Sequence, residues 1–112
     1  MRILSGIAPS GSIHLGNYLG AISQWKELQE TGECIFFIAD LHALTTPRDP
    51  KTFGKDMLRT ATELLAAGLN PEKCIIFIQS QVKEHTELCW LLNTITPVGE
   101  LERMTQYKEK SK

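Results

Sequence analysis

Long apolar runs, paired cysteine motifs and an excess of charge of one sign are all missing from this 112-residue sequence. No apolar run approaches the roughly 20 residues that a membrane-spanning helix requires, so no membrane association is expected. The chain opens into a strand-like segment without a charged and then apolar leader, so no secretory signal is expected. Lys and Arg total 12 against 13 acids, so nucleic-acid binding would need a local basic patch.

The three cysteines are odd in number and lie far apart in apolar surroundings, at Cys34, Cys74 and Cys89. None forms a Cys-x-x-Cys pair, which argues against both a zinc site and a redox motif. We therefore predict buried, reduced thiols in a cytoplasmic protein. Trp25 and Trp90 lie on apolar stripes of helical spacing, and we predict that both belong to the core.

Short apolar runs alternate with segments of helical periodicity along the chain. The runs predict strands near 2–6, 34–39 and 74–78, and the helical patterns fall near 15–28, 50–65 and 88–95. From Gly99 the chain continues as a polar segment. Uniformly apolar strands are typical of parallel sheets covered on both faces, and helical crossovers between them are right-handed. We predict an α/β fold, a Rossmann-like parallel sheet with flanking helices, spanning residues 1–112 and lacking the usual second half.

The most informative stretch links the first strand to the first helix and reads Gly-Ile-Ala-Pro-Ser-Gly-Ser-Ile-His-Leu-Gly-Asn over residues 6–17. This is the carboxyl edge of the sheet, where such folds bind phosphates. Gly11 and Gly16 permit tight turns and a close approach of the backbone to a ligand. Unpaired amide hydrogens at the helix start attract anions, while His14 and Asn17 add neutral donors. The stretch predicts a phosphate-binding loop.

Two common nucleotide-binding motifs are excluded in this loop. Gly11 and Gly16 have the glycine spacing of Walker A, but Asn17 stands where the phosphate-binding lysine belongs. The loop also lacks Gly-x-Gly-x-x-Gly, so the fingerprint of dinucleotide binding is absent. The remaining pattern, Pro-Ser-Gly followed by His-Leu-Gly-Asn, resembles the HIGH signature of class I aminoacyl-tRNA synthetases. A purely structural alternative is that His14 and Asn17 only cap a helix.

Further segments resemble tryptophanyl-tRNA synthetases in particular, and they follow in order along the whole chain. Asp-Leu-His-Ala-Leu-Thr at 40–45 is similar to the Asp-x-His-Ala-x-Thr segment of that family. Segments 67–73, 76–80 and 99–108 show the same likeness. The tail 108–112 superficially resembles the KMSKS signature, but that loop follows the second half of the family's fold. The resemblance implies the first half of a class I synthetase catalytic domain, without the second half and the anticodon-binding helical domain.

The resemblance implies a tryptophan–tRNA ligase, which uses ATP to convert L-tryptophan to tryptophanyl-adenylate and then charges tRNA(Trp). Magnesium is implied as the companion of ATP, and family members act as homodimers. A fragment of this length is expected to be inactive alone. Two alternatives stay open from the residues: another HIGH-type nucleotidyltransferase, such as a pantetheine-phosphate adenylyltransferase, and a non-catalytic nucleotide-binding or dimerisation module. Tyrosyl-tRNA synthetases are a closer cousin, disfavoured by segments 40–45 and 99–108.

The family's functional positions carry over residue by residue. The catalytic set implied by the resemblance is His14, Asn17 and Lys110, and the ATP-binding set is Ala8, Pro9, Ser10, Gly16 and Asn17. The substrate-binding set is Leu4, Gly6, His42, Gln106 and Lys108, and no protein metal site is expected. Ala8 replaces the glutamine of many relatives and Leu4 the phenylalanine of some. For His42, which follows a buried strand, a place in the core is the alternative interpretation.

Overall fold

The computed structural model describes residues 1–111, so that Lys112 in the C-terminal tail lies outside it. The chain consists of two compact units, Met1–Val82 and Lys83–Lys112. The first unit contains the sheet and the phosphate-binding loop predicted from the sequence, and the second is helical. Each unit is described by itself.

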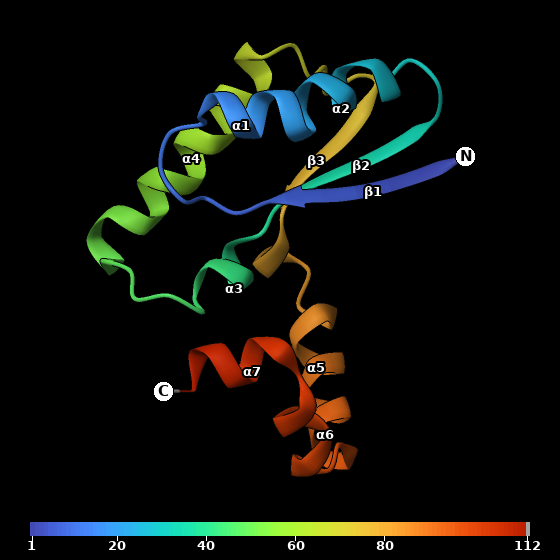
Figure 1. Cartoon of the computed structure of the whole chain (residues 1–112). Helices are drawn as coiled ribbons and strands as arrows, with labels where there is room; N and C mark the ends of the chain where they lie inside the picture. Colours follow the sequence, from blue (N-terminus) through green and yellow to red (C-terminus); the bar gives the residue numbers. More distant parts are fainter. Residues whose placement is uncertain (112) are drawn as a thin grey trace. The chain divides into compact units, whose positions relative to one another are not determined.

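The sheet has three parallel strands in the order β1 (Arg2–Ile7), β2 (Glu33–Ile38) and β3 (Cys74–Ile78). The register pairs Ile3 with Cys34, and Cys34 in turn with Cys74. Figure 1 shows the strands side by side, with helical crossovers between them. The predicted three-stranded parallel sheet of an α/β fold is confirmed.

The first predicted helix is divided into three consecutive segments, α1 (Leu15–Asn17), the π-helical η1 (Tyr18–Ile22) and α2 (Ser23–Leu28). The second is one helix, α4 (Pro50–Ala66), which begins as predicted with Asp49 accepting a hydrogen bond from the amide of Lys51 at 2.9 Å. It ends before Gly68, whose φ of +105° suits glycine. Two short elements were not predicted from the sequence, α3 (Asp40–Ala43) and the 3-10 turn η2 (Gln79–Gln81).

The core lies between the sheet and its two longer helices. Cys34, Phe36 and Ile38 point from β2 into this core, and the ring of Trp25 stacks on Phe36 with centroids 4.6 Å apart. Leu64 from α4 joins the same cluster and is fully buried. Trp25 is therefore a core residue, as predicted. Burial of such large side chains against one sheet face is the main force that holds this unit together.

The opposite face of the sheet is open within the first unit. Leu4 on β1 is 65% exposed and Ile75 on β3 is 55% exposed. The sequence predicted a sheet covered on both faces, which is wrong within residues 1–82. The reason is topological. Right-handed crossovers that advance in one direction place their helices on the same side, and both α2 and α4 contribute to the one core cluster.

The second unit consists of α5 (Glu84–Ile95), α6 (Val98–Arg103) and α7 (Thr105–Lys110). The helix predicted near 88–95 is confirmed, whereas the polar segment from Gly99 is helical. Cys89 is exposed and Trp90 is 71% exposed, so their predicted burial is wrong. A helical stripe buries its apolar side chains only against a partner, and no described residue from Lys83 onward is buried. Among residues 1–111, no helix is both long and apolar enough to cross a membrane.

Candidate functional site

The loop after β1 is fixed at the carboxyl edge of the sheet. Its first residues stay close to the strands, because Ala39, just after β2, donates its amide hydrogen to the carbonyl of Ile7 at 2.8 Å. Pro9 is fully buried, and Ser10 turns back to donate to the carbonyl of Ala8 at 2.9 Å. Gly11 follows with a φ of +114°, a conformation that side chains disfavour. The loop therefore has the predicted position and needs glycine at its bend.

His14 and Asn17 form a reciprocal cap at the start of α1. The amide of Asn17 donates to Nδ1 of His14, and the amide of His14 donates to Oδ1 of Asn17, both at 3.3 Å. Because Nδ1 accepts a hydrogen bond, the ring proton of the neutral imidazole sits on Nε2. His14 is exposed, so this Nε2–H is available to a ligand. His14 and Asn17 therefore do cap the helix, and the cap fixes which ring nitrogen of His14 carries the proton.

Several amide hydrogens at this helix start are already used inside the chain. The amide of Ile13 donates to Oε2 of Glu63 on α4 at 2.8 Å, in addition to the paired amides of His14 and Asn17. The prediction that the amides here are unpaired is wrong for these three residues. Sequence reasoning missed Glu63 because its partner lies fifty residues away and has no local signal.

The segment after β2 lies at the same edge of the sheet. Asp40 opens α3, is 5% exposed, and accepts a hydrogen bond from the amide of Ser80 at 3.0 Å. This bond joins the carboxyl ends of β2 and β3, since Ser80 lies in η2, two residues after the end of β3. His42 is exposed, which excludes its interpretation as a core histidine. The structure thus brings His42 to the strand ends that also support the loop.

Leu4 and Gly6 occupy the open face of β1 rather than the core face. They alternate with Ile3 and Ile7, which pack against the core cluster. Gly6 is register partner of Phe37, and a methyl group at Gly6 would lie 2.6 Å from that ring. The ring of Phe37 therefore packs closely against Gly6, a contact that a larger residue would block, while Gly6 itself remains exposed.

Three of the predicted site residues belong to the second unit. Gln106 and Lys108 lie in α7 with exposed side chains. Lys110 is the last residue of α7, and its side chain lies outside the described part of the structure. These three residues are supported as site residues by the sequence resemblance alone.

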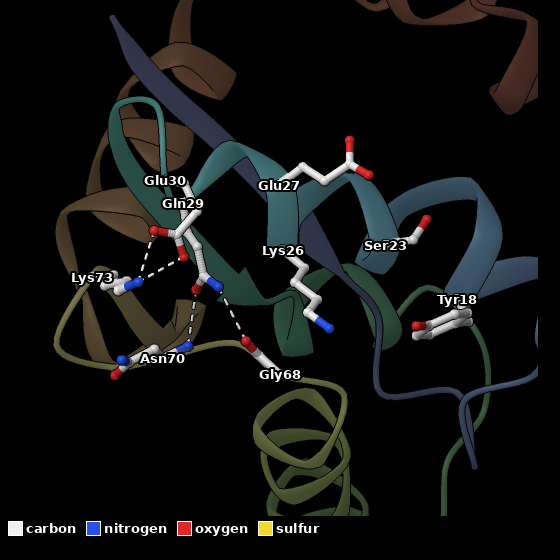
Figure 2. A pocket seen from close by; sticks show the side chains of 9 residues that line it. All are labelled: Tyr18, Ser23, Lys26, Glu27, Gln29, Glu30, Gly68, Asn70 and Lys73. Carbon is white, nitrogen blue, oxygen red and sulfur yellow. Dashed lines mark hydrogen bonds and ion pairs between the residues drawn. The ribbon is translucent and has the colours of Figure 1, made fainter.

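A polar hollow of about 550 Å³ lies at the opposite edge of the sheet, where β2 and β3 begin (Figure 2). Gln29 bridges its floor, donating to the carbonyl of Gly68 at 3.1 Å and accepting from the amide of Asn70 at 2.9 Å. Lys73 and Glu30 form an ion pair across it at 2.7 Å. These contacts link the end of α2 to the segment before β3, so we interpret this hollow as a structural junction distinct from the loop with His14.

Comparison with known proteins identifies the family. The profile of the family "tRNA synthetases class I (W and Y)" matches residues 1–112. The chain belongs to this family. It is 54% identical over 98% of its length to a tryptophan–tRNA ligase of Parasynechococcus marenigrum. Family membership also decides against a pantetheine-phosphate adenylyltransferase.

Solved structures give the same family assignment. Tryptophanyl-tRNA synthetase of Campylobacter jejuni, complexed with ADP and tryptophan, matches 99% of this chain with 43% identity and a TM-score of 0.89. Tyrosyl-tRNA synthetase of Archaeoglobus fulgidus, complexed with L-tyrosine, covers 88% with 25% identity and a TM-score of 0.74. The chain spans about a third of these relatives, 33% of the Parasynechococcus protein and 35% of the Campylobacter chain.

Proposed function

We propose that this chain is the ATP-binding front part of a tryptophan–tRNA ligase. The observation that carries the proposal is the loop between β1 and α1, which caps its own helix through Nδ1 of His14 and leaves Nε2–H for a phosphate oxygen. The tryptophan enzymes among the relatives support the amino acid. The complete protein then charges tRNA(Trp) in a second step.

The first step is a phosphoryl substitution that the site must orient. A carboxylate oxygen of tryptophan attacks the α-phosphate of ATP, the bond to the β-phosphate oxygen breaks, and pyrophosphate leaves with that electron pair. The carboxylate is already ionised at neutral pH, so no general base is required. The site must instead hold both substrates in line and stabilise charge that grows on the phosphates. Preoriented neutral donors serve that purpose.

The loop residues divide these tasks among themselves in our proposal. Ala8, Pro9 and Ser10 border ATP, and Gly16 lies against the adenine because it has no side chain. His14 donates from Nε2 to the phosphate chain as charge develops there. Asn17 uses Oδ1 for the amide of His14, which leaves its Nδ2 hydrogens for the phosphates.

The amino-acid pocket in our proposal uses the open face of the sheet. Leu4 and Gly6 present an accessible strand surface beside the ring of Phe37, which suits an indole. His42 borders that pocket from α3. The family resemblance adds Gln106 and Lys108 as substrate contacts and Lys110 as a contact to pyrophosphate.

Magnesium enters this proposal only as the companion of ATP. Among the described residues no group of three or more His, Cys, Asp or Glu side chains is arranged to hold a metal ion. Two acids at this edge of the sheet already accept backbone hydrogens, Glu63 from Ile13 and Asp40 from Ser80. The ion therefore binds through phosphate oxygens and water, its usual arrangement with nucleotides.

Homodimer formation is the proposed assembly, and α5 supplies part of its interface. This helix exposes large apolar side chains whose exposed fractions exceed one half, namely Leu88, Trp90, Leu91, Leu92 and Ile95. An apolar surface of this kind marks an interaction site. Sedimentation of the complete protein as a dimer, and a shift toward monomer in Trp90→Glu, would support it.

We also propose a cytoplasmic location, which the free cysteines favour.

The experiment that tests the function is ATP–pyrophosphate exchange with each amino acid, run on the complete protein and on the 112-residue chain. Exchange with tryptophan alone supports the proposal, and exchange with tyrosine alone refutes the choice of amino acid. The isolated chain is expected to show little or no tRNA charging. Charging by the isolated chain at a rate near that of the complete protein contradicts this expectation.

A further inference from the structure

We propose that Glu63 is a positioning residue for the reaction, acting on His14 through the backbone of Ile13. The proposal rests on the function proposed above. Oε2 of Glu63 accepts the amide hydrogen of Ile13 at 2.8 Å, and Ile13 directly precedes His14. Figure 1 shows α4 running beside the loop that leads from β1 to α1. A carboxylate from a distant helix thus holds the loop immediately before its proposed phosphate donor.

The helix that carries Glu63 is a rigid platform. Its neighbour Leu64 is fully buried, and Thr60, one turn earlier, is 1% exposed. Thr60 also donates its hydroxyl hydrogen to the carbonyl of Asp56 at 2.9 Å. Because these residues fix α4 against the core, the half-buried carboxylate of Glu63 is presented in a defined place.

The loop itself has two anchors. Pro9 is fully buried at its beginning, and Ile13 packs partly buried against the core cluster at its end. Between them Gly11 bends the chain with a φ of +114°. The side chain of Ile13 sets how closely the loop approaches the core. The hydrogen bond to Glu63 sets the orientation of the peptide plane that carries the Ile13 amide. That orientation fixes where the next residue, His14, begins α1.

The ionised form of Glu63 suits this role because a hydrogen bond to a carboxylate is about twice as strong as one between neutral groups. Because the amide of Ile13 donates to Glu63, it is no longer available as a donor to the nucleotide. The bond therefore selects which loop donors bind phosphate, leaving Nε2 of His14 as an outward donor. Glutamine at this position keeps an oxygen acceptor without the charge, which makes it the informative substitution.

The test is steady-state ATP–pyrophosphate exchange with tryptophan in the complete protein. Glu63→Ala should lower kcat by about 10- to 100-fold, because small displacements of an aligned group cost this much, with the KM for tryptophan unchanged. Glu63→Gln should retain most of the activity. Glu72→Ala is the matched control, since Glu72 is an exposed acid in the loop after α4, and it should exchange at the wild-type rate.

Two further measurements separate positioning from general stability. Hydrogen exchange at the Ile13 amide should be protected in the wild type and in Glu63→Gln, and fast in Glu63→Ala. On a His14→Ala background, Glu63→Ala should reduce kcat little further, because both changes remove the same contribution. The proposal would be overturned if the effects of Glu63→Ala and His14→Ala on kcat were fully additive. It would also be overturned if Glu63→Ala left kcat unchanged, or if Glu63→Gln were as slow as Glu63→Ala. Wild-type protein without tryptophan-dependent exchange would instead refute the proposed function.

Discussion

His14 and Asn17 bind each other at the first turn of α1, each accepting the other's backbone hydrogen at 3.3 Å. A single side chain thereby serves two purposes. One nitrogen of the His14 ring caps the helix, and that bond leaves the other nitrogen as a donor. Stability and chemistry are thus coupled at this residue, and substitutions can separate them.

His14→Asn should preserve the cap and remove the outward donor, since asparagine is among the best N-cap residues. Exchange with tryptophan in the complete protein should then fall by about 10²-fold or more, with little change in melting temperature. His14→Ala should lose the same activity and, in addition, about 1 kcal/mol of stability. An asparagine variant with wild-type turnover would leave His14 with the capping role only.

Gly11 and Gly20 form a matched pair for testing the loop. A methyl group at either position meets no heavy atom within 4 Å, so space does not distinguish them. Of these two glycines, Gly11 alone has a positive φ, at +114°. Gly11→Ala should therefore cost about 1–2 kcal/mol through backbone strain alone. Gly20→Ala, in a helical segment, should stabilise by up to about 1 kcal/mol. Urea unfolding of the two variants measures the difference, and equal effects would contradict the role of the bend.

Gln29 should be a stability residue without a role in turnover. It is 7% exposed and links α2 to the loop before β3 through the backbone of Gly68 and Asn70. Gln29→Ala should cost about 1–3 kcal/mol, because it leaves two partly buried backbone groups without this partner. Gln24→Ala, an exposed change in α2 five residues before Gln29, should stay within about 0.5 kcal/mol. Thermal unfolding reports the loss, and a large fall in kcat at unchanged fold would refute this assignment.

Cys74 should lower the stability of the folded state in alkaline solution. Burial, and then the neighbouring Cys34, raises the pKa of its thiol above the ordinary value. A raised pKa means that the folded state holds its proton where the unfolded state has lost it. The associated stability is complete below the unfolded value, about 8.5, and is lost as pH rises through the folded value. Melting temperatures above pH 8.5 should fall less steeply in Cys74→Ala, and parallel curves would contradict the assignment.

The elements that the sequence predicted correctly are those with strong local signals. The apolar run at Cys34 predicted β2, and Asp49 with Pro50 predicted the start of α4. The loop containing His14 was placed between strand and helix because its glycines follow an apolar run. Misassigned residues share a different property. Trp90 and Cys89 have core-like periodicity, yet their burial depends on a partner surface that periodicity does not reveal.

By itself the sequence determined the strand–helix alternation, the position of the loop that is predicted to bind phosphate, and the family resemblance, because each is encoded in neighbouring residues. Tertiary structure decided which groups meet across long separations. It paired Glu63 with Ile13 and Asp40 with Ser80, and it placed α2 and α4 on one sheet face. The physical reason is that a buried hydrogen bond forms only where folding brings donor and acceptor within about 3 Å, which no local pattern records.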